Sequence, residues 1–321
     1  MPQIRFAENI RTRYLDFMPI HLPPLNRRDF LVRSLLAGAG LAAGRPLLAA
    51  EKLKPIDPHF FALLSDTHID ANLKGALRGV VMADNLNAVT AEVNALPQRP
   101  AHALVNGDCA LLRGEPGDYA TFVELVKPLR AAGMPLHLTL GNHDDREHFW
   151  TGITEAGAVK RPVKDRHVSV VRMPRTNWFL LDSLDKVNFT PGLLGDDQLG
   201  WLTDALEKNA DKPAIVVGHH NPAETEHKGG LQDWDKLVAV LAPRRHVKAF
   251  IFGHTHNWRT WEHESGLHLV NLPPVAYVFK ADRPNGWVHA AVKPDGMRLQ
   301  LSALDKQHPE HGQVKELKWR A

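Results

Sequence analysis

Short apolar runs alternate with longer amphipathic segments along the chain from Phe60 onward. Such runs are typical of buried strands, whereas apolar residues three to four positions apart are typical of helices. Strand, loop and helix therefore repeat, which favours an α/β fold over an all-β fold. The predicted strands cover 60–64, 103–105, 136–140, 214–217 and 249–252, and the predicted helices cover 86–96, 119–132, 196–208 and 233–241.

The later part of the chain has a stronger strand pattern. Its apolar stretches are joined by turn residues such as those at 283–286, which read Arg-Pro-Asn-Gly. The sequence contains no internal repeat, low-complexity tract or interdomain linker, so we predict a single domain over residues 55–321. Further strands are predicted at 168–171, 178–181, 258–262, 267–270, 287–292 and 297–301.

The first fifty residues do not resemble the rest and are predicted to stand outside the fold. Paired Arg27-Arg28 precedes Phe30-Leu31, a weakly apolar Ala/Gly stretch at 35–44 and small residues at Ala49-Ala50. This order resembles a twin-arginine export signal. The resemblance implies that the twin-arginine export machinery is a partner and that the protein is periplasmic or extracellular. The pair lies far from Met1, which makes Met18 a candidate start.

An uncleaved membrane anchor is the alternative interpretation of the same segment. A helix that spans a membrane needs about 20 predominantly apolar residues. Arg33 and Arg45 interrupt the apolar stretch, so a signal is favoured over an anchor.

Composition narrows the chemistry. The chain has 321 residues, a formal net charge of +3 and Lys and Arg scattered along it, which leaves no nucleic-acid-binding signature. The single cysteine, Cys109, excludes an internal disulfide and a Cys-rich zinc site. A metal would therefore need His, Asn and carboxylate ligands, and the chain has 19 histidines.

Five polar motifs follow the five predicted strands. In an open α/β sheet, ligands gather outside the carboxyl ends of the strands, so we expect these motifs to converge on one crevice. Each motif alone is a weak signal, but all five in this order form a specific one. They are Asp66-Thr67-His68, Gly107-Asp108, Gly141-Asn142-His143-Asp144, His220-Asn221-Pro222 and Gly253-His254-Thr255-His256.

In these motifs the chain resembles the calcineurin-like metallophosphoesterases over residues 60–271. The residues of the five motifs are most similar to those of the class III cyclic-nucleotide and glycerophosphodiester phosphodiesterases. The resemblance implies a four-layer α/β/β/α sandwich of two mixed sheets flanked by helices. It also implies two divalent metal ions with Asp108 between them. One would be held by Asp66, His68, Asp108 and His256, and the other by Asp108, Asn142, His220 and His254.

The donor chemistry agrees with this assignment. Carboxylate, imidazole and amide oxygen together suit Mn, Fe, Co or Zn without selecting one of them. Residues 66 and 68, like 254 and 256, are expected to point the same way from an extended segment. Two metal ions can clamp a phosphoryl oxygen and hold a bridging hydroxide. The resemblance makes His143 the group that contacts the phosphate and protonates the leaving oxygen, and an imidazole can donate that proton.

Two assignments stay open at this stage. The family pattern places the ligand two residues before the proline, which favours His220 over His219. An acidic partner that orients His143 or another histidine of the site is expected among Asp70, Asp144 and Asp145, with no basis for choosing one.

The sequence also departs from two branches of the superfamily. Leu111 stands where purple acid phosphatases have a tyrosine ligand, and the Arg-bearing motifs of protein serine/threonine phosphatases are absent. Arg146 remains a candidate phosphate contact. We therefore predict an enzyme that hydrolyses small phosphodiesters. The alternatives are a phosphomonoesterase, a metal-binding relative without activity and a metallohydrolase for substrates without phosphorus. Specificity is expected in the loops at 70–79, 147–166, 224–230 and 272–285.

Overall fold

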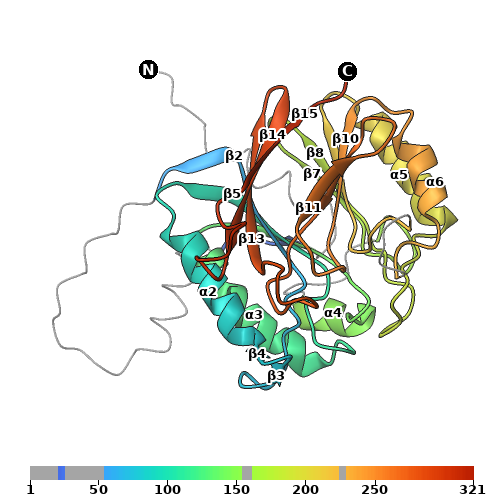
Figure 1. The fold of residues 1–321 in the computed structure, drawn as a ribbon. Helices are drawn as coiled ribbons and strands as arrows, with labels where there is room; N and C mark the ends of the chain where they lie inside the picture. Colours follow the sequence, from blue (N-terminus) through green and yellow to red (C-terminus); the bar gives the residue numbers. More distant parts are fainter. Residues whose placement is uncertain (1–20, 26–53, 154–160, 224–228) are drawn as a thin grey trace, which may run out of the picture.

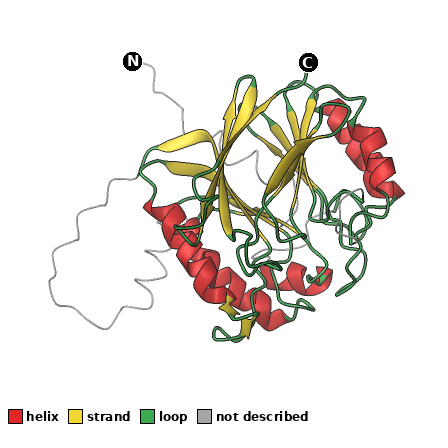
Figure 2. Cartoon of the chain, in the orientation of Figure 1, coloured by secondary structure: helices red, strands yellow, loops and turns green. Residues whose placement is uncertain are grey.

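Two β-sheets pack face to face, and helices cover the outer face of each sheet (Figures 1 and 2). The computed structural model describes residues 21–25, 54–153, 161–223 and 229–321. The predicted four-layer α/β/β/α sandwich is confirmed.

The larger sheet has seven strands, and its centre is parallel. Strands β2, β5 and β6 run in the same direction, so the residues that follow them emerge at one edge of the sheet. The order is β1 (His21–Leu22), β6 (Leu136–Thr139), β5 (Arg99–Asn106), β2 (Ile56–Ser65), β13 (Gly286–Lys293), β14 (Gly296–Ala303) and β15 (Val314–Lys318).

The second sheet has six strands, of which β8, β9, β10 and β12 are parallel. Its order is β11 (Arg259–Glu262), β12 (His268–Asn271), β10 (Val247–Phe252), β9 (Ala214–Val217), β8 (Asn177–Leu180) and β7 (Ser169–Arg172). A separate strand pair, β3 (Ala76–Leu77) and β4 (Val80–Val81), precedes the first long helix.

The helices divide between the two outer layers, as Figure 1 shows. On the seven-stranded sheet lie α2 (Met82–Ala95), α3 (Pro116–Ala131) and α4 (Arg146–Ile153). On the six-stranded sheet lie α5 (Asp196–Lys208) and α6 (Trp234–Leu241). None of the helices in the described ranges is long and apolar enough to cross a membrane.

Strand β2 shows why its apolar run is continuous. Phe61 and Leu63 face the second sheet, where Phe61 stacks on Trp178 with ring centroids 4.3 Å apart. Phe60 and Leu64 face the helices instead. Successive side chains of a strand point to opposite faces, so a strand covered on both faces needs apolar residues at every position.

Residues 21–25 belong to the fold, so the prediction that the first fifty residues stand outside it is wrong for these five. Strand β1 pairs with β6, and Leu25 N–H donates to the carbonyl of Arg130 at 3.0 Å. A chain of histidine contacts runs from β1 through β6 to β5. His21 Nδ1 lies 2.6 Å from His137 Nδ1, and His137 Nε2 lies 2.7 Å from His102 Nδ1. The predicted signal at 26–50 lies outside the described residues.

Helix α4 occupies the first part, residues 147–153, of the loop that was predicted at 147–166. The pattern was inconspicuous because only Phe149 and Ile153 of this helix are buried. Its start is capped from outside, since Asp145 Oδ1 accepts the backbone N–H groups of Glu147 and His148 at 3.0 and 2.9 Å. The rest of that loop is described only from residue 161, and 224–228 of another predicted loop is not described.

Candidate metal centre

Three of the predicted ligands meet where β2 and β10 end. His68 Nε2 lies 3.0 Å from His256 Nε2, and His256 Nε2 lies 3.4 Å from Asp66 Oδ1. All three side chains are buried, and each offers a ligand atom within 4.8 Å of the others. This spacing allows one metal ion to contact the three side chains together.

A second group forms around Asp108 at the end of β5. Asp108, His219 and His254 also have ligand atoms within 4.8 Å of one another. His219 Nε2 lies 3.3 Å from Asp108 Oδ2, and His68 Nε2 of the first group lies 3.7 Å from that same oxygen. Asp108 therefore stands between the two groups.

His220 of the fourth motif and the preceding His219 both reach this region. His219 Nδ1 contacts the carbonyl oxygen of Asn106 at 2.9 Å, which leaves Nε2 toward Asp108. His220 Nδ1 contacts Ser183 Oγ at 2.7 Å, and its ring centroid lies 4.6 Å from that of His254. Of these two histidines, His219 has its Nε2 near both carboxylates, 3.3 Å from Asp108 Oδ2 and 3.8 Å from Asp66 Oδ1.

The backbone at the predicted ligands is not extended, which corrects the expectation for residues 66, 68, 254 and 256. Asp66, His68, Asp108, His254 and His256 all have a positive φ, between 47° and 67°. A residue with a side chain adopts this left-handed region at a cost of roughly 1–2 kcal/mol. Hydrogen bonds between the loops, such as His68 N–H to the carbonyl of Asp108 at 2.9 Å, hold it there.

Two glycines allow these loops to approach one another closely. A Cβ at Gly141 would overlap Asp108 Oδ1, the oxygen that accepts the backbone N–H of His143 at 2.9 Å. A Cβ at Gly253 would overlap Ser65 Oγ. The glycines of the third and fifth motifs are therefore required because no side chain fits at these positions.

Asp144 links the second and third motifs. Its buried carboxylate accepts backbone N–H groups from Cys109, Ala110 and Gly141 at 3.2, 3.1 and 2.9 Å. Burial, with the charge of Asp108, raises the pKa of Asp144 to about 7. Asp144 thus positions the loops that carry Asp108.

His143 lies at the edge of the site, and none of the three acidic candidates orients its ring. Its Nδ1 lies 2.9 Å from the carbonyl oxygen of Leu112. A carbonyl oxygen only accepts, so Nδ1 carries the hydrogen. Asp145 caps α4, and Asp70 Oδ1 accepts the backbone N–H of Asn72. Sequence reasoning missed Leu112 because a backbone carbonyl leaves no residue-type signal.

The electrostatics of the site suit a cation. Burial opposes ionisation of Asp66 and Asp108, but the neighbouring histidines, His219 foremost, together outweigh it, so the pKa of both carboxyls is lowered. Burial also opposes charging of His219, yet Asp108 and Asp66 raise its pKa to about 10. Burial lowers the pKa of His68 to about 3, so this ring is neutral. Two carboxylates thus hold a positive charge beside a neutral imidazole.

The residues present fit divalent metal ions. Within the described part of the chain, Asn142 Oδ1 is buried without a hydrogen bond, and His219 Nε2 makes none beyond its charge contacts with Asp108 and Asp66. Burial of such atoms is costly unless a partner is supplied. Imidazole nitrogen, amide oxygen and carboxylate together are ligands of divalent first-row metals.

A pocket of about 240 Å³ opens onto these groups. Its walls come from the motif residues and from two loops outside the motifs. The lining residues are His68, Asp108, Asn142, His143, Thr190, His254, His256, Tyr277 and Phe279.

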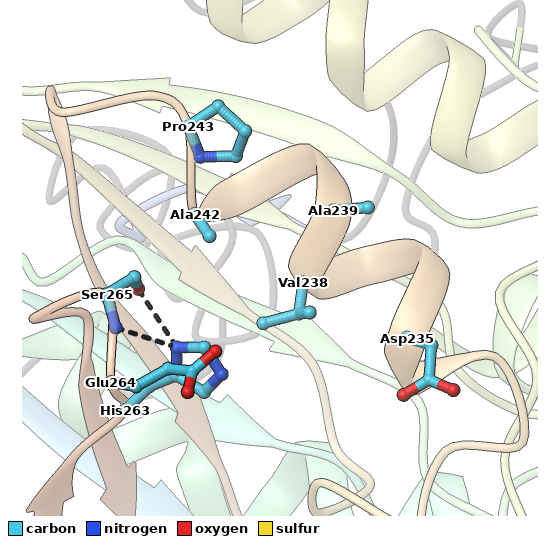
Figure 3. A pocket seen from close by; sticks show the side chains of 8 residues that line it. All are labelled: Asp235, Val238, Ala239, Ala242, Pro243, His263, Glu264 and Ser265. Carbon is cyan, nitrogen blue, oxygen red and sulfur yellow. Dashed lines mark hydrogen bonds between the residues drawn. The ribbon is translucent and has the colours of Figure 1, made fainter.

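A larger hollow of about 610 Å³, drawn in Figure 3, is separate from the metal centre. It lies between α6, which contributes Asp235 and Val238, and the turn 263–265 that joins β11 to β12. That turn adjoins the strand ends remote from the fifth motif, so this hollow shares no residue with the pocket of the metal centre.

Arg146 does not line the pocket. Its guanidinium pairs with the buried Asp182, Nε to Oδ2 at 2.8 Å and Nη2 to Oδ1 at 3.0 Å. The expectation of a phosphate contact at this residue finds no support in that geometry.

A model of the calcineurin-like phosphoesterase family matches residues 61–258. The match covers more than half of the chain, so the chain belongs to this family. It is a phosphoesterase, an enzyme that hydrolyses phosphoric esters.

Two relatives are similar to this chain over most of their length. The chain is 30% identical to the 3′,5′-cyclic adenosine monophosphate phosphodiesterase CpdA of Pseudomonas aeruginosa, over 67% of this chain and 76% of that protein. It is 27% identical to the glycerophosphodiester phosphodiesterase GpdQ of Enterobacter lignolyticus, over 70% of this chain and 81% of that protein.

Solved structures share the fold at low sequence identity. A dimetal phosphatase from Danio rerio superposes with a TM-score of 0.62 and 15% identity, over 82% of this chain and all of that chain. The purple acid phosphatase PPD1 of yellow lupin superposes with a TM-score of 0.57 and 13% identity, over 80% of this chain and 52% of that chain.

Proposed function

We propose that this protein is a two-metal phosphodiesterase for small phosphodiesters. The observation that carries the proposal is the position of Asp108 between two groups of metal-binding side chains. The relatives named for cyclic adenosine monophosphate and for glycerophosphodiesters support a diester substrate. The metals are drawn from Mn, Fe, Zn and Co, because the ligand set does not select among them.

The first proposed metal site consists of Asp66, His68, Asp108 and His256. The second consists of Asp108, Asn142, His254 and one of the adjacent histidines His219 and His220. The family motif favours His220 for that place, but the geometry favours His219, because its Nε2 lies 3.3 Å from Asp108 Oδ2. We therefore assign His219 as the ligand and His220 as its neighbour, held by Ser183.

The chain's own residues provide proton transfer and alignment. Divalent ions bound here would polarise the phosphoryl group and lower the pKa of an attacking water. Asp108 holds the backbone of His143, and the carbonyl of Leu112 holds its Nδ1–H. When the ring is protonated, Nε2–H can donate to the leaving oxygen from the wall of the pocket.

The test is hydrolysis of bis(p-nitrophenyl) phosphate by protein loaded in turn with Mn, Fe, Co and Zn. We expect wild-type turnover, a large loss in Asp108→Ala with reduced metal content, and a large loss in His143→Ala with metal retained. Absence of turnover with every metal would refute the proposal and favour a metal-binding relative without activity. A higher kcat/KM on p-nitrophenyl phosphate than on the diester would make the enzyme a phosphomonoesterase.

We also propose export by the twin-arginine machinery, supported by the motif at Arg27-Arg28. The test is cell fractionation of the full chain and of the double variant Arg27→Lys/Arg28→Lys. Export of the wild type alone would support the signal, whereas equal export of both would contradict it.

A further inference from the structure

Two aromatic side chains form one wall of the pocket, beside the proposed ligand His256. The ring of Phe279 stacks on that of His256 with centroids 4.2 Å apart and planes 16° apart, and Tyr277 lies 4.9 Å from the same ring. Tyr277 is 6% exposed, whereas Phe279 is 45% exposed. A large aromatic residue is thus presented to solvent at the mouth of the metal pocket.

An arginine from another part of the chain lies over this wall. Arg78 Cζ is 5.1 Å from the ring centroid of Phe279 and 5.8 Å from that of Tyr277. It belongs to the turn between β3 and β4, so two of the predicted specificity loops meet here. No carboxylate within the described ranges pairs with Arg78, and its guanidinium rests on the aromatic rings alone.

The wall is fixed relative to the metal centre. The carbonyl oxygen of Tyr277 contacts Nδ1 of His256 at 2.6 Å. The backbone N–H groups of Val275 and Ala276 donate to the carbonyls of Ser65 and Asp66 at 2.8 and 3.1 Å. A substrate held at the metals would therefore find the aromatic surface at one defined place.

The pocket is smaller than a typical site for a whole drug-sized ligand. Sites for drug-sized ligands usually measure about 300–1,000 Å³, and this pocket measures about 240 Å³. The organic part of a larger diester must extend over the rim. On the side of His256 the rim consists of Phe279 and Arg78.

We propose that Phe279 and Arg78 bind a planar ring in the organic part of the diester, which makes the enzyme selective for nucleotide-type over glycerol-type diesters. This inference rests on the proposed phosphodiesterase function. The guanidinium of Arg78 lies over the ring of Phe279, which supports it, and the other face of this exposed guanidinium can stack on a nucleobase beside the ring edge. A glycerol-type substituent has no ring and gains neither contact.

The experiment compares kcat/KM for cyclic adenosine monophosphate and for glycerophosphoethanolamine in metal-loaded wild type, Phe279→Leu, Phe279→Tyr and Arg78→Ala. Leucine retains apolar bulk but not the ring face, and tyrosine retains the face. We expect Phe279→Leu to lower the ratio of the two kcat/KM values roughly tenfold, through KM of the nucleotide. Arg78→Ala should lower it severalfold, and Phe279→Tyr should preserve it.

Arg259→Ala is the matched control, because Arg259 is also exposed and lies 5.0 Å from the ring of Trp261 outside the pocket. It should leave the ratio unchanged. Metal content is measured for every variant, since Phe279 packs on His256. Product inhibition by adenosine monophosphate and by glycerol phosphate reports binding, and only the former should weaken in Phe279→Leu.

Equal losses on both substrates, or an unchanged ratio in Phe279→Leu, would overturn the inference. So would a wild-type enzyme that hydrolyses the glycerol-type diester and not the nucleotide. Each of these results leaves the phosphodiesterase proposal intact. Wild-type protein that hydrolyses no diester with any metal would instead remove the proposed function itself.

Discussion

Nε2 of His219 lies 3.3 Å from Oδ2 of Asp108, and both side chains are almost completely buried. The imidazole is placed there by the carbonyl of Asn106 at the end of β5, while Asp108 follows two residues later. The end of β5, in the seven-stranded sheet, thus holds His219, which follows β9 of the six-stranded sheet, against Asp108. The metal centre is therefore located at the junction of the two sheets.

This contact predicts different effects for the two neighbouring histidines. We expect His219→Ala to lose one metal per chain, with affinity reduced by more than about a hundredfold, and His220→Ala to lose affinity by about tenfold. The measurement is metal content after dialysis against a weak chelator. Retention of metal in His219→Ala with loss of metal in His220→Ala would instead identify His220 as the ligand, as the family motif suggests.

The close approach of Gly141 to Asp108 predicts that Gly141→Ala lacks activity and binds metal poorly, because the new methyl group would displace the carboxylate. Gly200 offers a matched control in α5, where a Cβ would meet nothing within 4 Å. Alanine there should stabilise the helix by about 0.5–1 kcal/mol. Activity assays and denaturant titrations of both variants check this pair of expectations. Normal metal binding in Gly141→Ala would show that the loop can move aside.

The pairing of Arg146 with Asp182 predicts a structural role. Arg146→Ala leaves the buried Asp182 carboxylate with one weaker ion pair, to Arg166 at 4.0 Å, and two backbone N–H donors. It should cost roughly 3 kcal/mol of stability with KM unchanged. Arg244→Ala, which breaks a more exposed pair with Glu207, should cost about 1 kcal/mol or less. Urea denaturation and steady-state kinetics separate the two cases. An increase in KM for Arg146→Ala at unchanged stability would place that side chain at the phosphate after all.

The linked histidines of β1, β6 and β5 predict loss of stability in acid. Burial lowers the pKa of His21 and of His102 to about 4, from about 6.5 in an unfolded chain. The unfolded chain therefore binds more protons than the folded one in this window, so the free energy of unfolding falls as the pH drops from 6.5 towards 4. The double variant His102→Leu/His137→Leu should show a shallower decline in urea titrations across that range. An identical decline in both proteins would assign the acid sensitivity to other groups.

The elements predicted best from the sequence were those with uniform patterns. The bounds of β9 and α5 agree with the prediction residue for residue, because one is a continuous apolar run and the other starts at Asp196 and Asp197 with a regular apolar face. Strand β1 was missed because two residues carry no periodicity, and its position depends on an edge formed more than a hundred residues later.

The motifs were found because their residue types carry the chemistry, but their local geometry was not. Sequence offers no signal that Asp66 and His68 adopt a left-handed backbone, since that conformation is imposed by hydrogen bonds from the Gly107-Asp108 loop. The choice between His219 and His220 likewise depends on which ring faces Asp108, and adjacent residues of one type are equivalent in a sequence pattern.

The left-handed backbone at Asp66, Asp108 and His254 has a consequence for how ions enter the site. Neighbouring loops hold these conformations through contacts that involve no ion. The donor atoms are thus preorganised, and an arriving ion meets a cage whose main chain needs little rearrangement. The main chain therefore loses little conformational entropy when an ion binds. The arrangement of the donor atoms is a property of the folded chain and does not depend on the ions.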